Sequence, residues 1–318
     1  MEATYSAGLR PRPQLIISDK VFNVLLGVAG AVVLALIAIL GSSLAFGSSA
    51  ALKVFGWHFT IGTNWDPVKE DFGALPFIYG TLMSSILALL IAVPVGVGTG
   101  IFLAEIAPKR LAEPLAFVIE LLAAVPSVVY GMWGIFVIVP LMRSLQEYAG
   151  EHWSNCVLLS GPPVGVGLLT ASVVLAIMIL PFIAAISKDS LQAVPRTQAE
   201  AGLALGSTRW ETISGPVLRY ARKGIFGGII LALGRALGET MAVTMLIGNN
   251  PQITASLFRS AYSMSAVIAN EFSEATGDLH TSALVSIALV LLVLTLAVNA
   301  LARLLIWGVV SQSEGKAA

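Results

Sequence analysis

Charged residues are scarce in this chain of 318 residues. Asp, Glu, Lys and Arg together make up 11% of it, whereas a soluble domain has about 25%. Hydrophobic residues make up 57%, and the mean hydropathy is +0.87. Acidic and basic residues balance at 18 each, so net charge indicates no particular partner. The composition excludes a soluble domain and predicts an integral membrane protein.

Cysteine and the common catalytic motifs are also missing. Cys156 is the single cysteine, so an internal disulfide is excluded. The sequence has no Gly-x-x-x-x-Gly-Lys-Ser/Thr phosphate loop, no His-Glu-x-x-His zinc motif and no Gly-x-Ser-x-Gly nucleophile motif. We therefore expect no catalytic residue, no metal site and no bound cofactor. Any ATP that drives this protein would be hydrolysed by a partner subunit.

Six apolar runs are long enough to cross a bilayer core of roughly 30 Å, which needs about 20 helical residues. They cover about 21–46, 76–104, 114–142, 164–187, 224–248 and 281–309. The predicted fold is an all-α membrane protein with six transmembrane helices. A transmembrane domain at 21–310 would lie between an N-terminal tail at 1–20 and a C-terminal tail at 311–318.

Lys and Arg are distributed unevenly among the segments that flank these runs. The N-terminal tail, the connection at 109–110 and the long connection at 188–223 are basic, whereas the other connections are mostly acidic. Basic connections remain in the cytoplasm of a multi-pass protein. We therefore expect both termini and the 188–223 loop to be cytoplasmic.

Arg235 and Glu239 lie inside the fifth apolar run. A charge within the hydrocarbon costs several kcal/mol and marks a functional site by default. On a continuous helix the two residues lie on one face, one turn apart. In one interpretation Arg235 pairs with Glu239 at rest and contacts an anion in transit. In the other, the pair locks two helices and touches no substrate.

Four more polar residues are candidates for the same path. Thr240 either contacts substrate or bonds to its own helix backbone. Glu120 could be a second partner of Arg235, pair across subunits or remain protonated. Ser127 and Tyr130 follow a proline, and either line the path or make ordinary interhelical hydrogen bonds.

The 188–223 loop has a helical pattern of its own. Residues 200–206 predict a short helix that ends at Gly206. A group of apolar residues could form a patch there, namely Ala201, Leu205, Trp210 and Ile213. Such a patch, rimmed by charges, either binds another protein or packs back on the protein's own helices.

This loop resembles the coupling loop of ABC importer permeases. The family pattern is Glu-Ala-Ala, three residues, Gly, nine residues and then Ile-x-Leu-Pro. The matching residues are Glu200, Ala201, Gly206 and Leu218. The departures are Gly202, Pro216 and Arg219. The resemblance implies that the loop binds an ATPase subunit.

Three further motifs, at residues 72–81, 125–131 and 234–243, resemble the PstC-type permeases of high-affinity phosphate ABC importers. The resemblance covers roughly residues 65–310. It implies the type I importer (MetI-like) architecture and transport of inorganic phosphate across a bacterial or archaeal cytoplasmic membrane. Arg235 and Glu239 would be the residues most tied to translocation. The implied partners are a PstA-type second permease subunit, a PstB-type ATPase dimer and a PstS-type phosphate-binding protein.

Two other functions are weighed against phosphate import. A permease for another oxyanion, such as sulfate or molybdate, would show the same general pattern. An ion-coupled secondary anion transporter would work without an ATPase. The coupling-loop pattern argues against that second alternative, as does the lack of a visible inverted repeat. Nothing in the sequence indicates a nucleic-acid partner.

Overall fold

The computed structural model describes residues 19–153 and 156–314. Residues 1–18 and 315–318 of the two predicted tails lie outside this part. The chain divides into two units, Met1–Phe46 and Gly47–Ala318. In the first unit, α1 (Asp19–Gly47) is a single apolar helix whose described side chains are mostly exposed.

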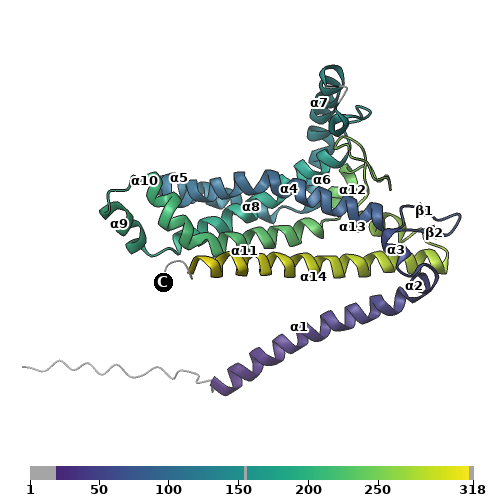
Figure 1. Cartoon of the computed structure of the whole chain (residues 1–318), viewed down its shortest axis with the longest axis horizontal. Helices are drawn as coiled ribbons and strands as arrows, with labels where there is room; N and C mark the ends of the chain where they lie inside the picture. The colour runs from purple at the N-terminus through teal and green to yellow at the C-terminus, as the bar shows by residue number, and fades with distance from the viewer. Residues whose placement is uncertain (1–18, 154–155, 315–318) are drawn as a thin grey trace, which may run out of the picture. The chain divides into compact units, whose positions relative to one another are not determined.

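The second unit is almost entirely helical (Figure 1). Its first elements are α2 (Ser49–Phe55), α3 (His58–Ile61), β1 (Trp65–Asp66), β2 (Asp71–Phe72), α4 (Leu75–Ile101), the π-helical turn η1 (Phe102–Ile106) and α5 (Lys109–Ala124). They are followed by α6 (Ser127–Trp133), the π-helical turn η2 (Gly134–Ile138), α7 (Val139–His152), the 3₁₀ turn η3 (Val157–Leu159) and α8 (Leu168–Gln192). The last elements are α9 (Arg196–Ala204), α10 (Arg209–Thr212), the π-helical turn η4 (Ile213–Val217), α11 (Leu218–Leu237), α12 (Met241–Leu246), α13 (Met264–Glu271) and α14 (Asp278–Glu314). The strands β1 and β2 form an antiparallel pair in which Trp65 lies opposite Phe72.

Helix α8 is the centre of the helical bundle. It packs along α4 and α11, and many of its side chains are fully buried, including Val174, Ile179 and Ile183. Because α8 packs against other helices on several sides, its apolar residues are spread around the whole helix and do not form one hydrophobic stripe. That is the expected pattern for a helix surrounded by other helices.

Five helical segments of the described chain are long and apolar enough to cross a membrane. They are Val21–Gly47, Leu75–Ile106, Ser127–His152, Leu168–Gln192 and Asp278–Leu304. The predicted runs at 114–142 and 224–248 are not continuous helices. The first is interrupted between α5 and α6, where Pro126 has no N–H to donate. The second is interrupted at residues 238–240, between α11 and α12.

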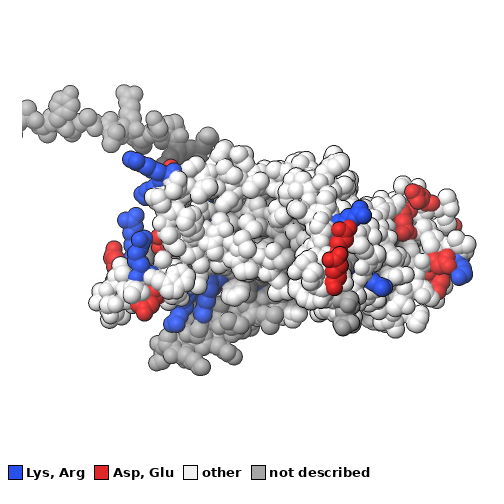
Figure 2. Space-filling view, turned by 90° about the horizontal axis from the view of Figure 1, so that it is seen from above, with Lys and Arg blue, Asp and Glu red and all other residues white. Residues whose placement is uncertain are grey.

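Charged side chains on the surface of the bundle are unevenly distributed. On the face shown in Figure 2, Lys, Arg, Asp and Glu gather toward its two ends, and the surface between them is uncharged. The 188–223 loop with α9 and α10 lies at one end, and the β1–β2 pair lies at the other (Figure 1). An uncharged belt between two charged ends is the surface that a bilayer requires.

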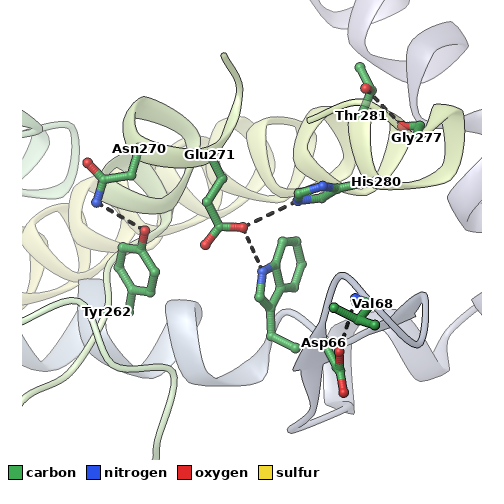
Figure 3. Close-up of polar contacts among 9 residues, drawn as sticks. Asp66, Val68, Tyr262, Asn270, Glu271, Gly277, His280 and Thr281 are labelled. Carbon is green, nitrogen blue, oxygen red and sulfur yellow. Dashed lines mark hydrogen bonds and ion pairs between the residues drawn. The ribbon is translucent and has the colours of Figure 1, made fainter. Parts of the chain in front are cut away.

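Glu271 joins three elements at the β1–β2 end (Figure 3). Its Oε2 accepts a hydrogen bond of 2.8 Å from Trp65 Nε1 and lies 3.3 Å from Nε2 of His280. Nearby, Asn270 Nδ2 donates to the Tyr262 hydroxyl at 3.0 Å, and burial raises the pKa of Tyr262 to about 12. His280 thus belongs to a polar cluster that the sequence analysis did not predict.

Candidate translocation site

The site is built around the interruption at residues 238–240. The helical hydrogen bonds weaken there, because the Gly238 N–H reaches the Gly234 carbonyl at 3.3 Å. The Glu239 carbonyl accepts instead from the Ser265 hydroxyl at 2.6 Å. A side chain from α13 thus satisfies a backbone group that the broken helix leaves open.

The carboxylate of Glu239 belongs to the start of α12. Its Oε1 accepts from the Ala242 N–H at 3.3 Å. The Thr240 hydroxyl donates to the Gly238 carbonyl at 3.3 Å, and the Thr244 hydroxyl donates to the Thr240 carbonyl at 2.7 Å. Both threonines therefore bond to nearby backbone. A negative group at a helix N-terminus is favourable, so Glu239 stabilises the restart of the helix.

Arg235 lies in the last turn of α11, just before the interruption. Its guanidinium carbon is 4.5 Å from the centre of the Phe182 ring on α8. A cation over an aromatic face is attracted by the ring. The Nε atom is buried and has no hydrogen-bond partner in the described part of the chain. The guanidinium therefore retains unused donor capacity, which suits an anion.

The expected geometry of Arg235 and Glu239 is wrong. The two residues do not lie one turn apart on a continuous helix, because α11 ends at Leu237 before Glu239 is reached. Within residues 19–153 and 156–314, no ion pair joins them. Arg235 contacts Phe182, and Glu239 contacts the backbone of α12.

The Tyr130 hydroxyl supports the backbone at the other interruption, between α5 and α6. In a continuous helix the Leu122 carbonyl would accept from the N–H of residue 126, but that residue is proline. The Tyr130 hydroxyl donates to this carbonyl at 2.7 Å. Tyr130 thus has a structural role at the break. Ser127 begins α6, is half-buried and makes no side-chain hydrogen bond to the described residues.

The two interruptions adjoin each other because α6 packs on α12. A Cβ atom at Gly131 would lie 2.6 Å from Met245 Sδ and 3.1 Å from the Ala242 Cα. Only glycine permits this approach. The structure therefore gathers Arg235, Glu239 and Tyr130 around two facing breaks.

Glu120 is not part of this group. Its carboxylate lies 3.3 Å from Lys188 Nζ on α8. The side chain is 58% exposed, and Lys188 also lies 3.6 Å from Asp189. Lys188 was not among the alternatives weighed for Glu120, which were Arg235, a residue of another subunit and a protonated carboxyl group. No sequence signal pointed to it beyond the opposite charges of two residues 68 positions apart.

The 188–223 loop forms the predicted short helix. Helix α9 includes Glu200 and Ala201, both exposed, and ends at Ala204. Gly206 follows with φ of +87°, a value that favours glycine. The helix end predicted at Gly206 is thus confirmed to within two residues.

The apolar patch of this loop differs in part from the prediction. Leu205 and Trp210 are 88% and 62% exposed, and Leu203 adds a third exposed apolar side chain. Ile213 was expected in the patch, but it is only 6% exposed because it lies in η4, which packs against α9, α10 and α11. The three exposed side chains form a patch that the loop does not bury.

Two departures from the coupling-loop pattern lie against each other. Gly202 is buried, and a Cβ atom there would lie 3.2 Å from Thr212 and 3.4 Å from Pro216. The glycine therefore accommodates the proline ring of η4. Leu218, which matches the pattern, begins α11 and is half-buried.

The start of α10 is fixed by a capping box. The Thr208 hydroxyl accepts from the Glu211 N–H at 3.3 Å, and Glu211 Oε2 accepts from the Thr208 N–H at 2.7 Å. These hydrogen bonds lower the pKa of Glu211. Arg209 Nη2 donates to the Glu105 carbonyl in η1 at 3.0 Å. The loop is thereby connected to the end of the second span, a link that the sequence did not indicate.

The fold and the exposed loop define a membrane permease of the ABC importer class. A solved structure described as an inward-facing conformation of the MetNI methionine ABC transporter matches with a TM-score of 0.55 and 16% identity. The match covers 73% of this chain and 94% of that chain. The likeness shows the permease fold that was predicted.

Residues 96–309 match the family model of the binding-protein-dependent transport system inner membrane component, and the chain belongs to this family. It is 47% identical to the phosphate transport system permease protein PstC of Mesorhizobium japonicum, with 90% of this chain and 89% of the relative covered. It is 48% identical to that of Pasteurella multocida, with 88% and 89% covered. A probable PstC of Methanocaldococcus jannaschii is 39% identical, with 80% and 82% covered.

These relatives confirm the predicted resemblance to PstC-type permeases. Membership of a permease family makes the chain a transporter subunit of the membrane and not an enzyme in its own right. ABC importers work as assemblies, so the chain acts together with other subunits.

Proposed function

We propose that this chain is a permease subunit of an ATP-driven importer of inorganic phosphate. The observation that carries the proposal is the Arg235 guanidinium, which lies at a helix break with a buried, unpartnered Nε. Relatives that are 47% and 48% identical are named phosphate transport permeases, which supports phosphate over other oxyanions. Sulfate and molybdate remain the alternatives for the test below.

Arg235 would compensate the charge of the crossing anion. A phosphate dianion loses its hydration in a low-dielectric path, and the planar fork of an arginine replaces it with charge-assisted hydrogen bonds. The ring of Phe182 holds the guanidinium in place while no anion is present. Arg235 stays charged at any physiological pH, so the path remains selective for anions.

Glu239 would control the affinity of this site. While its carboxylate accepts from the Ala242 N–H, it does not occupy Arg235. A shift of α12 would free the carboxylate to compete for the guanidinium and release the anion. Such competition is useful because a site that binds too tightly would stop transport.

The 188–223 loop would bind the ATPase. Its exposed side chains Leu203, Leu205 and Trp210 offer the apolar contact, and Glu200 lies beside them on α9. The loop and both termini would then be cytoplasmic. The assembly would contain a PstA-type second permease, a PstB-type ATPase dimer and a PstS-type phosphate-binding protein in a bacterial or archaeal cytoplasmic membrane.

The assembled importer reconstituted in liposomes tests this function. Uptake of labelled phosphate should require ATP and the binding protein, and an excess of sulfate or molybdate should not reduce it. An ATPase subunit should co-purify with the chain. Equal competition by sulfate would assign another oxyanion, and uptake driven by an ion gradient without ATP would assign a secondary transporter.

A further inference from the structure

A polar cavity of about 320 Å³ lies at the end of the bundle opposite the 188–223 loop. Three separate segments line it, and its polar side chains are Asn250, Gln252, Thr254, Arg259 and Ser260. These residues contribute one positive charge, several hydrogen-bond donors and no carboxylate. That set of groups suits a small anion.

Arg259 is the cation of this cavity and has no charged partner. Its side chain is exposed and forms no ion pair with any residue in the described ranges. Arg143, a second arginine at this end, behaves differently because its Nε lies 3.2 Å from Glu147. Arg143 thus pairs with Glu147, whereas Arg259 has no ion pair among the described residues.

Hydrogen bonds to backbone carbonyl groups hold the walls of the cavity in place. The Tyr79 hydroxyl donates to the Thr254 carbonyl at 2.6 Å, which ties one wall to α4. The Leu168 N–H, at the start of α8, donates to the Arg259 carbonyl at 3.0 Å. The positive end of a helix of 25 residues therefore lies beside Arg259 and adds to its field.

The cavity is also connected to the Arg235 site. The Ala261 N–H donates to the Ile247 carbonyl at 3.0 Å, and the Asn250 N–H donates to the Ala261 carbonyl at 3.2 Å. Both bonds hold the cavity at the C-terminal end of α12, whose other end carries Glu239. Helix α12 has six residues and is therefore about 9 Å long.

We propose that this cavity is a second anion site, which takes a small tetrahedral oxyanion before it reaches Arg235. The identification of that anion as inorganic phosphate rests on the proposed function, whereas the anion site itself does not. Arg259 binds the anion, and Asn250 and Ser260 add neutral donors. Arg259 lies beyond the C-terminal end of α12, and Arg235 lies before the interruption that precedes its N-terminal end, so the anion would pass along this helix from one cation to the other.

Protection from chemical labelling tests the site without any transport step. Cys156→Ser with Gln252→Cys places this chain's only thiol at the cavity. Labelling of this chain is followed in the permease–ATPase complex without ATP or binding protein. Inorganic phosphate should slow labelling by a membrane-impermeant maleimide, and chloride at equal ionic strength should not. Adding Arg259→Gln should raise the phosphate concentration for half-protection at least 10-fold. The matched Arg143→Gln variant should leave it within 2-fold.

Two outcomes would overturn the proposal. Protection that is unchanged by Arg259→Gln would show that the arginine binds no anion. Weaker capture of purified binding protein by the Arg259→Gln complex, with phosphate protection intact, would make this face a protein-docking surface. The assay measures labelling and not transport, so its result can be interpreted even if the importer does not transport phosphate. Protection by sulfate but not by phosphate would retain the anion site and reject phosphate import.

Discussion

The two helix interruptions face each other but are built differently. At Pro126 the lost hydrogen bond is replaced by a neutral one, from the Tyr130 hydroxyl to the Leu122 carbonyl. At residues 238–240 the backbone is likewise supported, by Ser265 and by the Glu239 carboxylate. Only the second interruption carries a buried charged group with an unused donor, the Arg235 Nε.

The difference separates a structural break from a functional one. A break whose polar groups are all satisfied gives the chain a bend and a rigid packing surface. A break that retains an unpartnered guanidinium is stable only because some other group, here the Phe182 ring, compensates part of the cost. Variants at the two breaks should therefore fail in different ways.

The largest effect is expected for Arg235→Gln. Phosphate uptake by the reconstituted importer should fall about 100-fold or more, because preorganised charge stabilisation of this kind is worth that much. The amount of ATPase that co-purifies should be unchanged. Arg235→Lys should recover only part of the uptake, because lysine lacks the fork of donors. Loss of assembly would instead favour a role of Arg235 in supporting the fold.

Gly131→Ala should come next, since it acts on the contact between the two breaks. The added methyl meets Met245 Sδ and the Ala242 backbone, so the free energy of unfolding should fall by about 1–3 kcal/mol. Uptake should fall several-fold although every charge is retained. Gly98→Ala is the control, because nothing lies within 4 Å of a Cβ there. Equal thermal stability of both variants would refute the close packing of α6 on α12.

Tyr130→Phe should have a smaller effect. It removes the hydroxyl that closes the proline break, and the free energy of unfolding should fall by about 1 kcal/mol. Uptake should stay within a few-fold of normal, as measured with labelled phosphate. Tyr220→Phe, at an exposed tyrosine on α11, should change neither quantity. If Tyr130→Phe abolished uptake as Arg235→Gln is expected to, Tyr130 would belong to the translocation path.

The smallest effect is expected at Glu271, at the end of α13 away from Ser265. Trp65→Phe removes the indole N–H that donates to Glu271. The free energy of unfolding of the detergent-solubilised protein should fall by roughly 0.5–1 kcal/mol. Uptake should not change. Trp57→Phe is the control, because Trp57 is 88% exposed. A loss of uptake in the Trp65 variant would show that this end takes part in transport.

The sequence predicted the fold class, the family and the short helix of the 188–223 loop. These follow from long apolar runs, from the Glu200–Gly206 spacing and from the other motifs in order. It did not predict the geometry of the site. A window that is apolar on average hides a break when the breaking residues, here Gly238 and Thr240, are tolerated in membrane helices.

Contacts between distant parts of the chain were also beyond sequence reasoning. The partner of Glu120 is Lys188, and the partner of Glu271 is His280. Ile213 is buried where η4 packs against α9, α10 and α11. In each case the residue type was compatible with several neighbours, and only the packing of the helices decides which one lies within reach.

The hydrogen bond from Arg209 to the Glu105 carbonyl connects movements of α10 in the 188–223 loop to η1, at the end of the second span. Because the acceptor is a main-chain atom of η1, a displacement of α10 acts on the backbone of the second span and not on a side chain that can rotate away. With Gly202 seated against Thr212 and Pro216, α9 and α10 have little room to move separately. A displacement of either short helix would therefore reach η1 and the adjoining α4 through the Arg209 side chain.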